Sequence, residues 1–247
     1  MAGLGAIRML ALKDGAARFG IKLDDRQVRL FESYYADLSV WNRRANLTSI
    51  TDYTEVQVKH FLDSLTVLLA IREYPGFPRV KAIDVGSGAG MPGVPLKIAF
   101  PEIDMTLLEA TGKKIAFLNH LKETLRLNGM EVICGRAEDT GRQPGQREQY
   151  DIVLGRAVAT LPTLLELTLP FCRIGGIFVA QKQVETGPET ERSTQAANTL
   201  GGQLREIIEV DLPQLPPQRS LLVYEKVFAT PTKYPRRPGM PAKRPII

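Results

Sequence analysis

The chain has 247 residues, 44% of them hydrophobic and 24% charged, a composition that excludes collagen, a coiled coil and a wholly disordered protein. It carries 32 basic and 27 acidic side chains, which gives a net charge of +5. The segment 230–247 contains no acid and accounts for the whole excess with Lys233, Arg236, Arg237, Lys243 and Arg244. A neutral body with a basic tail argues against a globally basic nucleic-acid coat and indicates a local polyanion contact or a solvated end.

The start of the chain and its two cysteines bear on the compartment. No apolar window approaches the roughly 18 residues of a membrane span. The apolar run 1–12 is short and continues directly into Lys13 and Asp14, so we expect a first helix there and not a signal peptide. Cys134 and Cys172 form neither a C-x-x-C motif nor a metal-ligand pair. We therefore expect a cytoplasmic protein with no membrane partner and no metal site.

Residues 1–75 are predicted to form a helical N-terminal region. Over 31–41 the large apolar side chains recur every three or four residues, which is typical of one buried helix face. A second run with the same period covers 55–71. Proline and glycine in 74–78 then interrupt the pattern, so we place the boundary of the next domain there.

From residue 76 onward, strand-length apolar runs alternate with helical stretches. The runs cover 80–85, 105–108, 131–134, 150–154, 177–180, 205–212 and 220–227. Alternation of this kind gives a parallel sheet with helices on both faces, but the last two runs are too close together for a parallel crossover. The pattern predicts an α/β, Rossmann-like fold of the S-adenosylmethionine (SAM)-dependent methyltransferase type, with seven mostly parallel strands and the last one antiparallel. The methyltransferase domain should cover 76–229, followed by an extended, basic, proline-rich tail over 230–247.

A glycine-rich segment, 84–93, follows the first predicted strand. Glycines there let the backbone approach a ligand closely at the start of the next helix, although a tight strand-to-helix turn would use the same residues. The spacing departs from the dinucleotide motif G-x-G-x-x-G, because Met91 follows Gly86 and Gly88 at the third glycine position. Asp84 would repel a pyrophosphate and suits a cationic ligand that bears an amino acid.

Two acids follow the next two predicted strands. Glu109 ends the second strand, where a carboxylate can accept hydrogen bonds from both hydroxyls of a ribose. Ala137 and Glu138 follow the third strand, where an adenine would lie and a carboxylate could accept a hydrogen bond from its amine. Either acid could instead face solvent or stabilise a helix N-terminus. Together with the glycine segment, these positions favour SAM over NAD.

The end of the fourth predicted strand, 154–157, indicates the kind of methyl acceptor. It has neither the Asn/Asp-Pro-Pro-aromatic element of amine methylation nor a Pro-Cys nucleophile for attack on a pyrimidine C5. The acceptor is therefore expected to be nucleophilic already, as guanine N7 is, and to need alignment and not a general base. Arg156 is the side chain that we expect to point into the site and position the reactants.

Further polar side chains are candidates for the substrate side. Arg136, Arg156 and Lys182 each end or follow a strand at one sheet edge, where cations suit RNA phosphates or the O6/N7 edge of guanine. Taken singly, each could be a solvated charge. His60 and Asp63 lie three residues apart on one helix face, which is more typical of a structural pair than of a substrate contact.

The ordered motifs resemble those of the bacterial RsmG family, also called glucose-inhibited division protein B, the 16S rRNA guanine-N7 methyltransferases. The similarity runs from about Tyr34 to the tail. Its motifs are Trp41-Asn42, Asn46-Leu47-Thr48, 59–65, 84–95, 107–114, 135–138, 155–159 and 233–239. Several separate motifs in one order are far more specific than the glycine segment alone.

The resemblance implies roles for individual positions. The family's SAM contacts fall on Gly86, Met91, Glu109, Ala110, Thr111, Ala137, Glu138 and Arg156. Its RNA-side residues fall on Asn46, His60, Arg136, Lys182 and Arg219. Three positions depart from the family's usual residues, namely Met91, Gln183 and Ser220, and Ser220 stands where a histidine is frequent, which puts any role of that histidine in doubt.

The implied substrate is a guanine in the decoding-region loop of 16S rRNA, and the implied partner is the small ribosomal subunit. We expect a monomer that does not bind DNA. Two alternatives stay open: a SAM-dependent methyltransferase of a protein or small molecule, and a SAM-binding, RNA-interacting protein without turnover. An NAD oxidoreductase is a more distant alternative.

Overall fold

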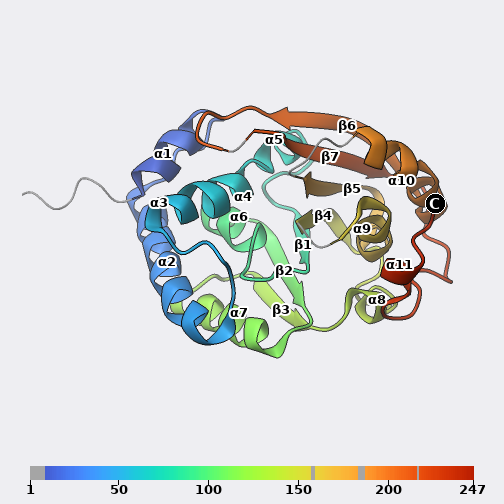
Figure 1. The fold of residues 1–247 in the computed structure, drawn as a ribbon, viewed down its shortest axis with the longest axis horizontal. Helices are drawn as coiled ribbons and strands as arrows, with labels where there is room; N and C mark the ends of the chain where they lie inside the picture. Colours follow the sequence, from blue (N-terminus) through green and yellow to red (C-terminus); the bar gives the residue numbers. More distant parts are fainter. Residues whose placement is uncertain (1–8, 157–158, 183–186, 216) are drawn as a thin grey trace, which may run out of the picture.

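A computed structural model of the chain describes residues 9–156, 159–182, 187–215 and 217–247. Its strands are β1 (Lys81–Val85), β2 (Asp104–Glu109), β3 (Met130–Cys134), β4 (Tyr150–Arg156), β5 (Cys172–Lys182), β6 (Gly202–Val210) and β7 (Arg219–Lys226). They form one sheet in the order β3-β2-β1-β4-β5-β7-β6 (Figure 1). β7 runs antiparallel to both of its neighbours, and all other pairs are parallel. The predicted fold, with six strands in one direction and the last reversed, is confirmed.

Helices cover both faces of this sheet. They are α1 (Leu10–Ala17), α2 (Asp25–Ala45), α3 (Tyr53–Val56), the π-helix η1 (Gln57–Leu62), α4 (Asp63–Leu65), α5 (Leu68–Ile71), α6 (Gly93–Ala99), α7 (Gly112–Thr124), α8 (Ala137–Thr140), α9 (Leu161–Thr168), α10 (Gly187–Leu200) and α11 (Met240–Lys243). Side chains of each strand alternate between two cores. Ala82 of β1 joins the core under α1 to α7, and the next residue, Ile83, joins the core under α9 and α10.

The N-terminal helices belong to the same packed body as the sheet. Helix α2 begins with a capping box between Asp24 and Gln27. The Gln27 amide also donates to the carbonyls of Ile98 and Ala99 at 3.1 and 2.9 Å, which fixes α2 to α6. The Tyr34 hydroxyl donates to the Ala89 carbonyl at 2.5 Å. The predicted boundary after residue 75 thus marks a change from helices to sheet within one shared core.

The helical run predicted over 55–71 is divided. It contains α3, the six-residue π-helix η1, α4 and α5. A π-helix places one extra residue in its turn, and such turns are frequent at functional sites. The apolar period alone does not reveal this insertion, because the flanking residues keep the ordinary helical spacing.

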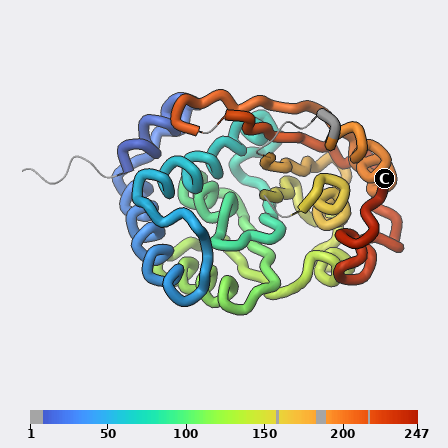
Figure 2. The backbone as a smooth tube through the Cα atoms, in the orientation of Figure 1, coloured from blue at the N-terminus to red at the C-terminus, as the bar shows by residue number. Residues whose placement is uncertain are grey.

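The expectation of a free, extended tail over 230–247 needs correction. The segment contains α11 and packs beside α8 and α9, as the red end of the chain in Figure 2 shows. Its proline content excludes a long helix but does not prevent docking, because its backbone carbonyls accept hydrogen bonds from arginines of the body. Among the described residues, no helix is long and apolar enough to cross a membrane.

Candidate functional site

A cavity of about 540 Å³ opens at the carboxyl ends of β1, β2, β3 and β4. This is where ligands bind in open α/β sheets, and the volume lies in the range of small-molecule sites. The loops after β1, β2 and β3 supply much of the wall, and the N-terminal helical region closes one side. The lining includes Leu47, Thr48, His60, Gly86, Gly88, Met91, Glu109, Ala110, Thr111, Lys114, Arg136, Ala137, Glu138 and Arg156.

The glycine-rich loop between β1 and α6 keeps part of this cavity open. Gly88 adopts φ +60°, a left-handed conformation that favours glycine. A Cβ atom added there would meet only the Gly86 carbonyl oxygen, at 3.9 Å, so it would point into open space. At Gly93, by contrast, a Cβ atom would lie 2.4 Å from the Leu107 side chain. The loop therefore needs glycine at Gly93 for packing and at Gly88 for the backbone turn.

Asp84 lies behind this loop and is fully buried. Its Oδ2 accepts the Gly93 N–H at 2.9 Å, while Oδ1 has no hydrogen-bond partner. Burial raises the pKa of Asp84 to about 7, although the Gly93 N–H and the Arg156 charge oppose the rise. Asp84 does not line the cavity. The structure therefore gives it the task of fixing the loop, and its direct contact with a ligand stays a prediction.

Glu109 at the end of β2 lines the cavity. Its Oε2 accepts the Gly88 N–H at 3.0 Å, and its Oε1 accepts the N–H groups of Ala110 and Thr111 at 3.0 and 2.8 Å. Burial acts to raise the pKa of Glu109, but these N–H groups and Lys114 hold it below its ordinary value. The carboxylate is therefore ionised at neutral pH and rigidly oriented, as a bidentate acceptor for a pair of hydroxyls requires.

Glu138 on α8 forms another part of the cavity wall and is 3% exposed. Its Oε1 accepts a hydrogen bond from the Arg136 guanidinium at 2.8 Å and one from the Gly239 N–H at 3.0 Å. Burial opposes ionisation, but these donors hold the pKa of Glu138 below its ordinary value. Sequence reasoning placed Glu138 and Ala137 at this wall but gave no sign that the C-terminal segment reaches it.

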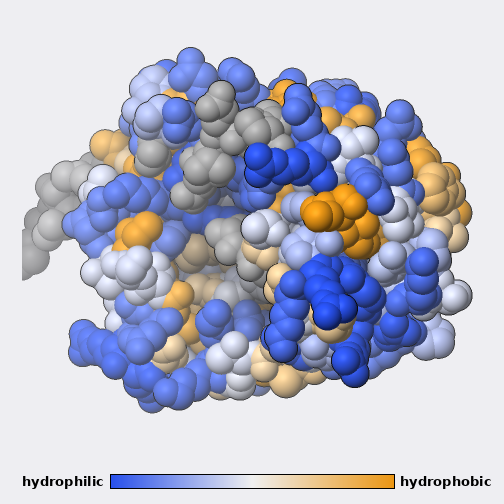
Figure 3. Space-filling model, turned by 45° about the vertical axis from the view of Figure 1, so that its right-hand side comes forward, coloured by the Kyte–Doolittle hydropathy of each residue, from blue (hydrophilic) through white to orange (hydrophobic). Residues whose placement is uncertain are grey.

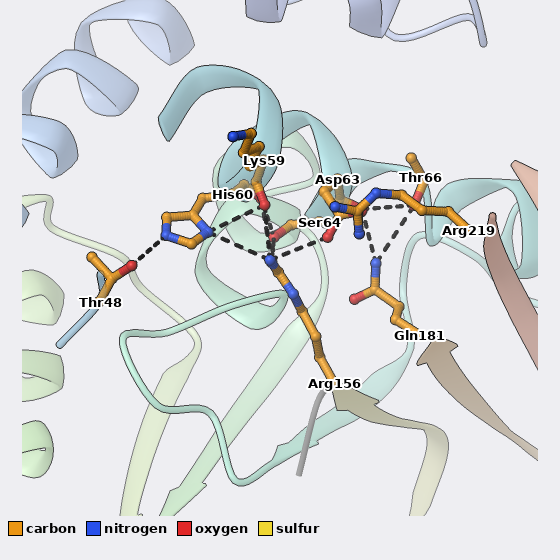
Figure 4. Close-up of polar contacts among 9 residues, drawn as sticks. All are labelled: Thr48, Lys59, His60, Asp63, Ser64, Thr66, Arg156, Gln181 and Arg219. Atoms are coloured by element: carbon orange, nitrogen blue, oxygen red, sulfur yellow. Dashed lines mark hydrogen bonds and ion pairs between the residues drawn. The ribbon is translucent and has the colours of Figure 1, made fainter. Parts of the chain in front are cut away.

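Arg156 reaches from the end of β4 into a buried polar cluster under the N-terminal helices (Figure 4). Its guanidinium donates to the Lys59 carbonyl at 2.8 Å and to Ser64 Oγ at 3.2 Å. It also lies 3.2 Å from Asp63 Oδ2, with 11% of its side chain exposed. The predicted position of Arg156 in the site is consistent with this geometry, since the side chain lines the cavity and is held from behind.

Asp63 holds two arginines at once. Its Oδ1 lies 2.7 Å from Arg219 Nη1, on the side opposite Arg156. Burial raises the pKa of Asp63, while the two guanidinium charges act to lower it. The Gln181 amide donates to the Asp63 carbonyl at 2.8 Å. His60 and Asp63, three residues apart, therefore make separate contacts and do not pair with each other.

His60 faces both the cavity and Arg156. Its Nε2 lies 2.7 Å from Thr48 Oγ1, and its Nδ1 lies 3.4 Å from Arg156 Nη2. Burial, together with the neighbouring Arg156 charge, lowers the pKa of His60 to about 4. The imidazole is therefore neutral at pH 7, and it joins the segment after α2 to the strand end.

The structure separates the five predicted RNA-side residues. His60 and Arg136 line the cavity, while Asn46, Lys182 and Arg219 do not. Arg219 is 8% exposed and pairs with Asp63, and Lys182 pairs with Glu189 at 2.9 Å. Both cations thus serve internal contacts. Asn46 is exposed at the end of α2, in the left-handed conformation, directly before the lining residues Leu47 and Thr48.

Sequence reasoning gave no role to several of the lining residues, and Thr48 and Lys114 are two of them. Thr48 belongs to a recognised motif but received no role, and Lys114 lies on the first turn of α7, 4.0 Å from Glu109. A lysine five residues after an acid at a strand end, on the first turn of the next helix, indicates such a contact. Among the residues that the structure describes, no cluster of three or more His, Cys, Asp or Glu could hold a metal ion.

Comparison with known proteins adds an independent line of argument. The family model described as rRNA small subunit methyltransferase G matches residues 27–219. The chain is 48% identical over 233 residues to a protein of Dehalococcoides mccartyi named Ribosomal RNA small subunit methyltransferase G, covering 94% of this chain and 97% of that protein. A protein of the same name from Roseiflexus castenholzii is 49% identical over 232 residues, with 94% and 97% covered.

A solved structure agrees on the fold. The crystal structure of TrmN from Thermus thermophilus superposes with a TM-score of 0.51 at 14% identity, covering 69% of this chain and 53% of that chain. At this identity the likeness bears on the fold alone.

Proposed function

The chain belongs to the rRNA small subunit methyltransferase G family, and we propose that it transfers a methyl group from SAM to N7 of a guanine in 16S rRNA. The target guanine lies in the decoding-region loop, as the resemblance of the motifs implies. Relatives that are 48% and 49% identical carry a name that states methylation of small-subunit rRNA, and the chain spans 97% of each.

The observation that carries the choice of cofactor is the position of Glu109. Its ionised carboxylate is held by three backbone N–H groups at the carboxyl end of β2, beside the open space at Gly88. An anion here suits the two hydroxyls of a nucleoside, and the loop after β1 offers backbone without side chains in the way. The residues present therefore fit SAM.

Other lining residues fit the rest of such a ligand. Glu138 presents a second carboxylate to the cavity and would accept a hydrogen bond from the amine of an adenine. Met91 and Ala137 supply small or flexible apolar contacts for the purine and the thioether chain. SAM, when bound, supplies the electrophilic methyl group.

The chain's own part in the reaction is alignment and electrostatics. Guanine N7 has an exposed lone pair and loses no proton on methylation, so the site needs no general base. Arg156 is fixed by the Lys59 carbonyl, Ser64 and Asp63 at the cavity wall, where it can orient the base or a phosphate. His60, neutral at pH 7, offers hydrogen bonding without adding charge.

The RNA side rests on few placed cations. Arg136 lines the cavity with 55% of its side chain exposed, and Lys114 lines it from α7. These side chains suit phosphate contacts at the mouth of the cavity. Asn46 lies on the same side and could read a base edge. We keep Lys182 and Arg219 as candidates only for an indirect role, because both are engaged in internal ion pairs.

The proposed substrate also indicates the partner and the location of the protein. We infer that the protein acts on the small ribosomal subunit in the cytoplasm and as a monomer. Figure 3 supports the monomer, since the face shown is mostly hydrophilic and its hydrophobic residues form small separate groups. Light scattering of the purified chain would test the monomer, and a stable dimer mass would contradict it.

A transfer assay tests the proposed reaction. Purified protein is incubated with tritiated SAM and small ribosomal subunits that lack the modification, and the rRNA is digested to nucleosides. We expect label in 7-methylguanosine at one site. Label in protein or in another nucleoside would favour a different acceptor, and SAM binding without any transfer would indicate a binding protein without turnover.

A further inference from the structure

The C-terminal segment from Thr230 to Lys243 is fastened to the body by backbone contacts. The Arg147 guanidinium donates to the carbonyls of Thr230 and Tyr234 at 2.6 and 2.8 Å. Arg142 donates to the carbonyls of Lys233 and Pro235 at 2.9 and 2.8 Å. Contacts to main-chain carbonyls fix the path of this segment whatever its side chains are.

Arg236 provides the strongest of these attachments. Its guanidinium forms a two-pronged ion pair with Glu166 of α9, with Nη2 to Oε2 at 2.6 Å and Nε to Oε1 at 2.9 Å. The Arg236 N–H also donates to Glu166 Oε1 at 2.8 Å. Glu166 is fully buried, so its charge needs this partner. One of the tail's five cations is therefore committed to the interior.

Three residues further along, the segment reaches the cavity wall. Gly239 adopts φ +81°, which turns its N–H toward α8 and the Glu138 carboxylate, 3.0 Å away. The acceptor is the same Oε1 that Arg136 holds at 2.8 Å. Beyond this turn, Thr163 of α9 donates to the Pro241 carbonyl at 3.1 Å. Glu138 is thus clamped between a cation of its own loop and a backbone donor from the chain's end.

We propose that the segment 230–243 is a strap that positions Glu138 for the adenine amine of the cofactor, with Arg236 as the positioning residue that holds the strap. This inference rests on the proposed SAM site. Arg136 is the carboxylate's partner from its own loop, and a second donor that fixes its orientation improves its geometry as an acceptor. The strap acts on the cofactor through Glu138, and Arg236 acts on Glu138 through Gly239.

The competing interpretation of the same segment is a flexible arm for RNA phosphates. That interpretation predicts loss of RNA affinity with unchanged cofactor affinity when the tail is altered. The strap predicts instead that replacing Arg236 lowers cofactor affinity and leaves RNA affinity unchanged, because this side chain pairs with the buried Glu166 of the body. Arg237, its exposed neighbour, provides a matched control of equal charge.

Calorimetric titration with two nucleosides distinguishes the strap from a general structural role. S-adenosylhomocysteine carries the adenine amine, while S-inosylhomocysteine has an oxygen in its place. We expect R236A to raise the Kd for S-adenosylhomocysteine about tenfold, the loss expected for one charge-assisted hydrogen bond. The Kd for S-inosylhomocysteine should not change, and R237A should leave both Kd values unaltered. R236K, which keeps one ion-pair donor, should recover part of the affinity.

A second variant guards against loss of the fold. Because R236A leaves Glu166 buried without a partner, the pair E166Q/R236Q replaces the ion pair by two neutral amides and should show the same ligand-selective loss. Equal losses for both nucleosides, or no loss for S-adenosylhomocysteine, would overturn the strap. Failure of the unaltered chain to bind S-adenosylhomocysteine would instead refute the proposed cofactor, so the two failures are distinguishable.

Discussion

At the scale of single residues, the partners of each charged side chain of the site determine its ionisation and the direction in which it points. Glu109 and Glu138 are held ionised by N–H groups and cations, and both were predicted from their places after strands. Lys182 was predicted to face RNA from its place after a strand, and Arg219 from the family resemblance, but they pair with Glu189 and Asp63. Sequence position indicates which edge of the sheet a side chain reaches and does not indicate which partner takes its charge.

Replacing Arg156 tests the alignment role. We expect R156A to lower kcat on small subunits by about 100-fold or more, the scale of losing a positioning or electrostatic group. The far-ultraviolet circular dichroism spectrum should stay unchanged. Since Asp63 keeps Arg219 as a partner, the buried acid is not left alone. Unchanged kinetics would remove Arg156 from the site.

Replacing Gly88 tests the cofactor loop. A valine Cβ would point into the open space of the cavity and would also be strained at φ +60°. We therefore expect G88V to abolish measurable SAM binding in calorimetry. Substituting alanine for Gly20, which also has positive φ but faces open space away from the cavity, controls for backbone strain. Normal SAM affinity in G88V would contradict the placement of the ligand.

At the scale of elements, the π-helix η1 is the feature that the sequence pattern concealed. Its residues Lys59 and His60 supply a carbonyl and an imidazole to Arg156, and Asp63 follows directly. The apolar period predicted a helix here and its buried face. It could not predict the extra residue in the turn, since that depends on the polar cluster beneath, where Ser64 and Gln181 also bind.

Changing Asp63 tests how this helical segment holds the strand end. D63N keeps the size of the side chain but loses the charge shared by Arg156 and Arg219. We expect lower stability, by about 3 kcal/mol as for a broken buried pair, and a lower kcat with little change in the Kd for SAM. Urea unfolding and single-turnover kinetics measure the two effects. Equal losses in kcat and in SAM affinity would assign Asp63 to the cofactor instead.

At the scale of the whole molecule, the N-terminal helices, the sheet and the C-terminal segment form one body around the cavity. The seven strands and the reversed last strand were predictable, because apolar runs and loop lengths carry that information. The docking of the tail was not, since it depends on contacts between carbonyls of 230–235 and two arginines far away in the chain. The five basic residues behind the net charge of +5 therefore lie on a docked segment, where all of them except Arg236 are exposed.

Two buried groups with shifted pKa values, Asp84 and His60, contribute to the pH dependence of the stability of the folded chain. The pKa of Asp84 is about 7 in the folded state, against an ordinary value of 3.8. The folded state therefore binds more protons than the unfolded state, and the free energy of unfolding falls as the pH rises from 4 to 7. The pKa of His60 is about 4 in the folded state, against an ordinary value of 6.5. Here the unfolded state binds more protons, and the free energy of unfolding rises as the pH rises from 4 to 6.5. The two slopes oppose each other.

We expect the contributions of Asp84 and His60 to the free energy of unfolding to cancel in large part over this range. D84N should unmask the rise from His60, by about 3 kcal/mol across the interval, and H60Q should unmask the fall from Asp84, by about 4 kcal/mol. Urea titrations at several pH values measure both. Parallel profiles for the two variants would contradict the assigned shifts.

The central claim is that this protein makes 7-methylguanosine in 16S rRNA. Nucleoside mass spectrometry of rRNA from cells with and without the gene tests it most directly. We predict that 16S rRNA from cells lacking the gene has lost one 7-methylguanosine in the decoding-region loop, and that the intact gene restores it but its R156A form does not. An unchanged amount of 7-methylguanosine at that position in cells without the gene would contradict the claim.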